Sequence, residues 1–92
     1  MKRETPIAPK KNVIGDRVRQ ARFRLSPVVT QEDLAGRLSA QHLPMDRSAV
    51  ARIELGERYV LDYELIALAR VLKTTTGWLL GEIDDPRIPK RF

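Results

Sequence analysis

The chain has no cysteine and only one histidine among its 92 residues. Without cysteine, disulfide bonds, thiol catalysis and cysteine-ligated zinc sites are excluded. The single histidine, His42, has no partner for a metal site, and we interpret it as a surface residue in a turn. No Ser/His pair at a meaningful spacing, phosphate-binding loop or metal cluster is visible, and Asp84-Asp85 is an isolated acidic pair beside a proline. These absences argue against an enzyme and against a bound metal or other cofactor.

Aromatic residues and long apolar runs are also scarce. Phe, Trp and Tyr make up 5% of the chain, so a core must be built mainly from aliphatic side chains. No apolar run approaches the roughly 20 residues of a membrane span, and the basic N-terminus lacks the apolar segment of a secretory signal. We therefore expect a cytoplasmic protein without a membrane partner. Its length suits one domain with one modest core.

Positive charge is in excess and unevenly distributed. The formal net charge is +5, from 17 Lys and Arg against 12 Asp and Glu. Residues 1–60 hold 12 of the basic and 7 of the acidic residues, whereas residues 61–92 hold five of each. The whole excess therefore lies in the first two thirds of the chain, as expected for a surface that binds phosphates. An ordinary basic protein with a solvated tail would have the same net charge.

Two short helices joined by a tight connection are predicted within residues 30–58. Thr30 is a favourable N-cap for the first, and Asp33 can reach back to complete a capping box. Asp46 should cap the second helix, and Gly56 should end it in a left-handed conformation. The first helix carries one apolar stripe at helical spacing, formed by Leu34, Ala35 and Leu38.

The second of these helices separates into two faces at about 100° per residue. One face is apolar except for a single carboxylate and should be buried: Ala49, Val50, Ile53 and Glu54. The other is small or cationic and carries no carboxylate: Arg47, Ser48, Ala51, Arg52 and Leu55. Arginine can contact guanine through two hydrogen bonds, serine can reach several base edges, and alanine can touch a thymine methyl group. The pattern is typical of a helix that enters the major groove, but a solvated surface helix can also carry two arginines.

Three further helices should support this pair: residues 13–25, residues 63–73, and a short one that holds Trp78, Leu79 and Leu80. The expected core faces of the first two are Ile14, Val18, Ala21 and Leu25, then Leu65, Ile66, Ala69 and Leu72. Asp62 should cap the second, and Thr75 or Thr76 the third. The chain then divides into a flexible basic arm, residues 1–12, a helical domain, residues 13–83, and an extended tail, residues 84–92.

The order and spacing of these helices resemble the Xre/Cro-like helix-turn-helix family of phage and bacterial repressors. The resemblance covers about residues 14–81, and it rests on the motifs Ile14-Gly15-Asp16-Arg17-Val18-Arg19 with Arg22, Thr30-Gln31-Glu32-Asp33-Leu34-Ala35, Arg52-Ile53-Glu54-Leu55-Gly56-Glu57-Arg58, Leu65-Ile66-Ala67-Leu68-Ala69 and Trp78-Leu79-Leu80-Gly81. It implies an all-α fold, a compact five-helix bundle of the lambda-repressor-like DNA-binding type. The segment between Leu38 and Ile53 is longer than the family's common pattern, and no glycine marks its turn.

The resemblance also implies which residues meet double-stranded DNA. The set is Arg22, Gln31, Arg47, Ser48, Arg52 and Arg58, and Ala51 joins it because the helical period places Ala51 on the same exposed arc. Those on the exposed arc of the third helix would face base edges, whereas Gln31 and Arg58 would lie at the DNA backbone. Arg22 would lie close to a phosphate and would also form a salt bridge with Glu54, between the first and third helices.

The leading functional interpretation is sequence-specific binding of double-stranded DNA by a transcriptional regulator of the repressor type. One recognition helix reads only about three or four base pairs, so we expect a homodimer that binds two half-sites. The apolar residues expected to form its contact are Trp78, Ile83, Ile88 and Phe92. The alternative is a helix-turn-helix module that holds a partner protein, such as an antitoxin or an adaptor. Such a module should expose an apolar patch, and the outer face of residues 47–55 offers only Leu55.

Overall fold

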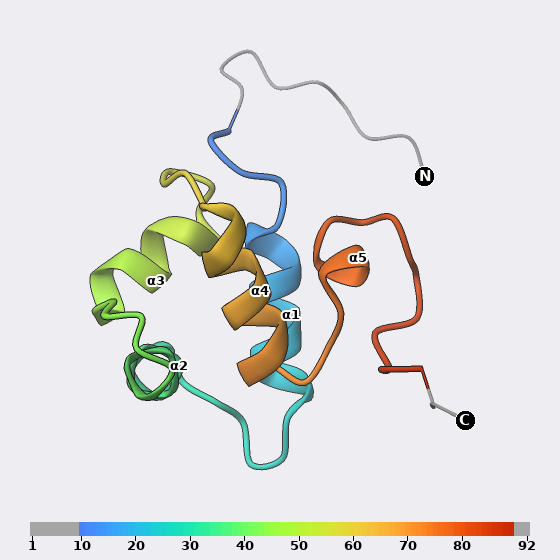
Figure 1. Cartoon of the computed structure of the whole chain (residues 1–92), viewed down its shortest axis with the longest axis horizontal. Helices are drawn as coiled ribbons and strands as arrows, with labels where there is room; N and C mark the ends of the chain where they lie inside the picture. The colour runs from blue at the N-terminus through green and yellow to red at the C-terminus, as the bar shows by residue number, and fades with distance from the viewer. Residues whose placement is uncertain (1–9, 90–92) are drawn as a thin grey trace.

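The computed structural model describes residues 10–89, and these residues form α-helices and no β-strand (Figure 1). The helices are α1, Gly15–Arg24; α2, Gln31–Ala40; α3, Arg47–Glu54; α4, Asp62–Val71; and α5, Thr76–Leu79. The all-α class predicted from the sequence is therefore confirmed. Within residues 10–89, no helix has the length and apolar character needed to cross a membrane.

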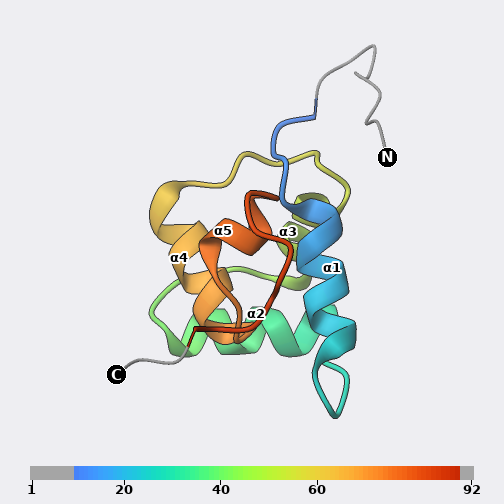
Figure 2. The same cartoon turned by 90° about the vertical axis from the view of Figure 1, so that its right-hand side faces the viewer.

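The helices enclose one core. α3 packs on α1 and α2, α4 packs on α2 and α5, and α5 also contacts α1. Figure 2 shows α1 and α4 on opposite sides of the molecule, with α5 in front of the space between them. The core is aliphatic, as the composition predicts, and Trp78 is the only buried aromatic residue within the described range. The largest fully buried side chains of this core are Leu34, Leu38, Ile53, Leu68, Leu72, Leu79, Val18, Val29 and Val50.

Several helix boundaries follow the predicted capping chemistry. Thr30 Oγ1 accepts a hydrogen bond from the Asp33 amide at 3.0 Å, and the Asp33 carboxylate accepts one from the Thr30 amide at 3.1 Å. The hydrogen bond from the Thr30 amide lowers the pKa of the Asp33 carboxyl. Asp46 caps α3 and Thr75 caps α5, each by accepting a hydrogen bond from the amide three residues further on. Gly56 ends α3 at φ 76°, as expected.

The connection between α2 and α3 turns without a glycine. His42 adopts the left-handed conformation at φ 63° and is exposed to solvent. Its amide donates to Ser39 O, and the Leu43 amide donates to Leu38 O, both at 3.0 Å, so that these two carbonyls in the last turn of α2 are satisfied. Met45 is then buried, which brings the longer connection back onto the core before α3 begins.

Two expectations for α4 are wrong. Asp62 is the first helical residue and not the cap; Leu61 is the N-cap, and its amide donates to the Glu64 carboxylate at 3.0 Å. Ile66, which periodicity places in the core, is 49% exposed, whereas Leu68 is fully buried. The reason is that α4 contacts both α2 and α5, and this places the buried arc on Glu64, Leu68, Ala69 and Leu72.

The predicted core face of α1 needs a smaller change. Ile14, Val18 and Ala21 are buried as expected, while Leu25 is half-buried because α1 ends one residue before it. In α5, Trp78 and Leu79 are buried, but Leu80 is 39% exposed.

The start of the described chain belongs to the folded part of the molecule. The Lys11 amide donates to Gly56 O at 2.8 Å, and the side chain of Lys10 lies against Gly56. The predicted basic arm, residues 1–12, therefore has contacts with the domain over residues 10–12, and its remainder lies outside the described residues.

Candidate nucleic-acid interface

The outer arc of α3 is exposed as predicted. Arg47, Ser48 and Arg52 are exposed, Ala51 is half-exposed, and Leu55 is 60% exposed at the end of the helix. The opposite arc is buried, and its members are Ala49, Val50, Ile53 and Glu54. The first turn of α3 contains no acidic residue, so its positive dipole end is offset only by the Asp46 cap before it. The two faces inferred from helical periodicity are therefore confirmed.

A buried ion pair joins α3 to α1. Arg22 Nε lies 2.6 Å from Glu54 Oε2, and Arg22 Nη2 lies 2.9 Å from Glu54 Oε1. The two side chains are only 7% and 5% exposed. Arg22 Nη1 also donates to Val29 O at 3.0 Å, so each of the three guanidinium nitrogens has an acceptor. The salt bridge predicted from the sequence is confirmed, and its parallel two-bond geometry restricts the rotation of α3 against α1.

The same carboxylate extends a hydrogen-bond chain to the surface. Gln31 Nε2 donates to Glu54 Oε1 at 3.1 Å, and Arg47 Nη1 donates to Gln31 Oε1 at 3.4 Å. Three of the predicted DNA-binding residues, Arg22, Gln31 and Arg47, are thus linked through Glu54. These hydrogen bonds fix the Gln31 side-chain amide at the start of α2, beside the first turn of α3.

Arg58 has a protein partner that the sequence did not reveal. Its guanidinium donates to both carboxylate oxygens of Glu64, at 2.9 and 3.1 Å, and to Tyr59 O at 3.0 Å. The hydrogen bond to Glu64 raises the pKa of Arg58. Burial raises the pKa of Glu64, but the hydrogen bonds from Arg58 and the Leu61 amide outweigh it, so that the pKa lies below its ordinary value. The signal available in the sequence was the position of Glu64 in the first turn of α4, where a carboxylate completes a cap.

The residues expected to form a dimer contact are not all available. Trp78 is only 4% exposed, and its ring lies under the guanidinium groups of Arg17 and Arg24 at 4.8 and 5.7 Å. The expectation that Trp78 contributes to an interface is therefore wrong, since α5 folds back on α1 and buries it. Ile83 and Ile88 are exposed, and Phe92 lies outside the described residues.

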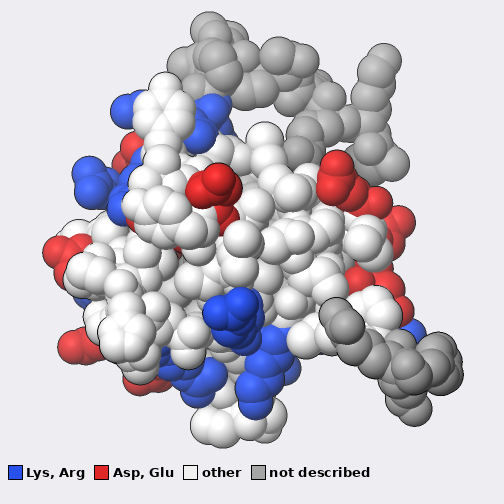
Figure 3. All heavy atoms as spheres, in the orientation of Figure 1, with Lys and Arg blue, Asp and Glu red and all other residues white. Residues whose placement is uncertain are grey.

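A different apolar area is exposed on α4 and the loop before it. Its members, each about half exposed or more, are Tyr59, Leu61, Tyr63 and Ile66. Figure 3 shows a white area over α4 between charged side chains. Tyr63 and Ile66 lie about one helical turn apart, so both point to the same side of α4. Periodicity alone assigns Ile66 to the core, and for that reason the sequence does not predict this surface.

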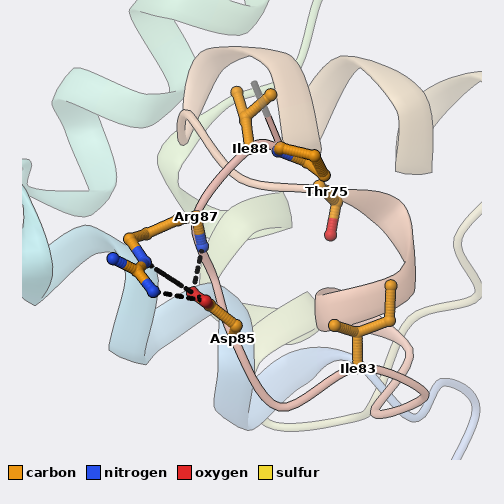
Figure 4. Close-up of a pocket in the computed structure, with 6 residues that line it drawn as sticks. Thr75, Ile83, Asp85, Arg87 and Ile88 are labelled. Atoms are coloured by element: carbon orange, nitrogen blue, oxygen red, sulfur yellow. Dashed lines mark hydrogen bonds and ion pairs between the residues drawn. The ribbon is translucent and has the colours of Figure 1, made fainter. Parts of the chain in front are cut away.

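The C-terminal tail forms a shallow hollow with the start of α5 (Figure 4). An exposed ion pair between Arg87 and Asp85, at 2.7 Å, forms part of its wall, and the hydrogen bond from the Arg87 side chain lowers the pKa of Asp85 to about 2. The remaining wall is mainly apolar, from Ile83 and Ile88. Between Lys10 and Pro89, every buried side-chain nitrogen or oxygen has a hydrogen-bond partner, and no group of three His, Asp or Glu residues could hold a metal ion.

Comparison of the chain with protein-family models, with curated proteins and with solved structures finds no match. The likeness to the Xre/Cro-like family accordingly stays a prediction from the residues quoted above. A functional conclusion depends on the outer arc of α3 and on the contacts that hold this helix.

Proposed function

We propose that this protein is a cytoplasmic transcriptional regulator that binds double-stranded DNA in a sequence-specific manner, with α2 and α3 as a helix-turn-helix. The observation that carries the proposal is the outer arc of α3. It is exposed, lacks carboxylates and presents Arg47, Ser48 and Arg52 on a helix whose opposite arc is buried. Such a helix can insert into the major groove without disturbing the core.

The supporting elements suit the same role. The Gln31 amide is held at the start of α2 by Glu54, and the positive end of the α2 dipole lies there too. The dipole favours a DNA phosphate at this point, against the Glu32 and Asp33 carboxylates of the same turn, and the second N–H of the Gln31 amide can donate to it. Arg22 stays within the pair with Glu54, so its main contribution is to hold α3 in place. Arg58 would need to keep its bonds to Glu64 while it contacts a phosphate through its remaining N–H groups.

A homodimer would give the protein enough contacts to select one site among many. One α3 helix of eight residues reads only a few base pairs, whereas a two-fold pair reads two half-sites about 34 Å apart. We place the contact between two copies on Tyr63 and Ile66 of α4, because these large apolar side chains have no partner within residues 10–89 that covers them.

The decisive experiment measures discrimination between duplexes. A preferred site is first selected from a random library, and fluorescence anisotropy then gives affinity for that site and for random duplex at two salt concentrations. Arg47→Ala and Arg52→Ala should each cost about 1–3 kcal/mol at the preferred site and less on random duplex. The matched control is Arg87→Ala, an exposed arginine in the C-terminal tail, outside both the outer arc of α3 and the proposed contact on α4. A parent protein that binds no duplex even at low salt would remove the proposal, and equal losses on both duplexes would limit the two arginines to phosphate contacts.

A protein-interaction module is the second candidate function, and the apolar surface of α4 is the observation that favours it. Sedimentation of the parent and of Ile66→Glu separates the possibilities. A dimer that Ile66→Glu converts to a monomer, with weaker binding to the preferred site, supports the two-fold regulator. A parent that is monomeric and binds no DNA favours a different protein as the occupant of α4.

A further inference from the structure

One side chain, Asn12, joins three segments of the fold. Its Oδ1 accepts the amides of Ile14 and Gly15 at 3.0 and 2.9 Å, at the start of α1. Its Nδ2 donates to Ile53 O in the last turn of α3 at 3.0 Å and to Arg58 O in the following loop at 2.9 Å. An asparagine amide has two donor hydrogens and two acceptor sites, and all four are used here.

The backbones of α1 and α3 touch beside this side chain. A Cβ atom on Gly15 would lie 2.5 Å from Ile53 O and 2.6 Å from Glu54 O, closer than any side chain allows. The glycine therefore lets the first turn of α1 lie directly against the last carbonyls of α3. The Lys11 amide adds a bond to Gly56 O at 2.8 Å, just past the end of α3.

These contacts complete the attachment of α3 along α1. The two hydrogen bonds between Arg22 and Glu54 start from a residue seven positions after Gly15, which is about 10 Å further along the axis of α1. Both attachments reach the C-terminal end of α3, at Ile53 and Glu54, so together with the packing of α3 on α2 they fix how this end of the helix lies along α1. Asn12 supplies the side-chain hydrogen bonds of the second attachment, beside the backbone bond of Lys11 and the close packing of Gly15.

We propose that Asn12 is a positioning residue for α3: its amide holds the C-terminal end of this helix against the first turn of α1 and so sets the angle at which the outer arc meets base edges. The assignment rests on the proposed function for its effect on DNA, but the effect on the angle of α3 can be measured in the free protein. Base contacts tolerate little displacement, because a hydrogen bond weakens steeply once its distance or angle departs from the optimum.

Two variants of the full chain separate the contributions of this side chain. Asn12→Asp keeps the two acceptor bonds at the start of α1 but cannot donate to Ile53 O or Arg58 O. Asn12→Ala removes all four bonds without introducing charge. The control is Leu72→Val, a truncation in the core just past the end of α4 that lowers stability and leaves the junction of α1 and α3 untouched.

Residual dipolar couplings of the backbone amides report the orientation of α3 relative to α1 in each protein. We expect both Asn12 variants to change the couplings of α3 while those of α2 and α4 fit the parent. We also expect the affinity ratio between the preferred site and random duplex to fall about tenfold, with the ratio for Leu72→Val as in the parent. Because a ratio is compared, a uniform loss of affinity caused by the negative charge of the Asn12→Asp variant cancels.

The outcomes are distinguishable. Unchanged couplings of α3 in both variants would overturn the assignment, as would an equal fall in the ratio for Leu72→Val. A shift of α3 with an unchanged ratio would overturn the link to base recognition. If the parent itself fails to discriminate between duplexes, the proposed function fails, and the couplings alone then decide whether Asn12 positions α3.

Discussion

The pair of Arg22 and Glu54 allows the most direct test of how α3 is held. Glu54→Ala leaves the guanidinium of Arg22 inside the protein without its carboxylate, and both side chains are less than a tenth exposed in the parent. Loss of one partner of a buried pair costs about 3–5 kcal/mol. A domain of this size has a total stability of about 5–15 kcal/mol, so this single change removes a large share of it. At about 4 °C or more per kcal/mol, the melting temperature should fall by at least about 12 °C.

The assay is urea denaturation followed by circular dichroism, with a thermal scan in parallel. The control within the same chain is Asp85→Asn, which breaks the exposed pair with Arg87, and no measurable change is expected there because exposed pairs are solvated and screened. Replacing both buried partners, Arg22→Met with Glu54→Leu, should recover much of the loss, because no unpaired charge remains. If Glu54→Ala unfolds at the same urea concentration as the parent, the idea of a buried, mutually dependent pair is refuted.

Three further changes test other contacts. The pKa of Glu64 is lowered in the fold, so the ionised carboxylate stabilises the protein fully above the ordinary pKa of 4.5. This stabilisation is lost as the pH falls through the lowered pKa. In thermal melts between about pH 7 and pH 3, Glu64→Gln should therefore remove this part of the dependence of stability on pH. His42→Gly should raise the free energy of unfolding by about 0.5–1 kcal/mol, because the gain from removing a side chain at a left-handed backbone position exceeds the cost of the greater entropy of the unfolded chain. Ser39→Gly inside α2, where the backbone is helical, should instead lower the free energy of unfolding. Gly15→Ala should destabilise the protein and shift the amide resonances of Ile53 and its neighbours, because the added methyl meets backbone that cannot move aside as a flexible side chain can; unshifted resonances would contradict the close approach of α1 and α3.

The helices and most of their ends could be predicted from the residues alone. A cap is made by residues three apart, so Thr30 with Asp33, and Asp46 before α3, could be identified without any tertiary contact. The two arcs of α3 were predictable for a related reason, because a helix packed on one side of a small core shows a clear period of 3.6 residues. The angular position of Glu54 around α3, at the edge of the buried arc, was consistent with the salt bridge to Arg22 that the family resemblance implied.

Which distant groups meet depends on packing that no local pattern encodes. Periodicity failed in α4 because this helix packs against two neighbours, and the buried arc moved from Ile66 to Leu68. The position of Glu64 in the first turn of α4 indicates a cap but does not show that Arg58 is its partner, and nothing local shows that Trp78 lies under two arginines of α1. Asn12 is the clearest case: its four bonds reach α1, α3 and the following loop, up to 46 residues away. Such a side chain acquires its partners only when packing has brought these backbones together, since sequence spacing constrains neighbours within a few turns and leaves the choice among remote polar groups to the fold.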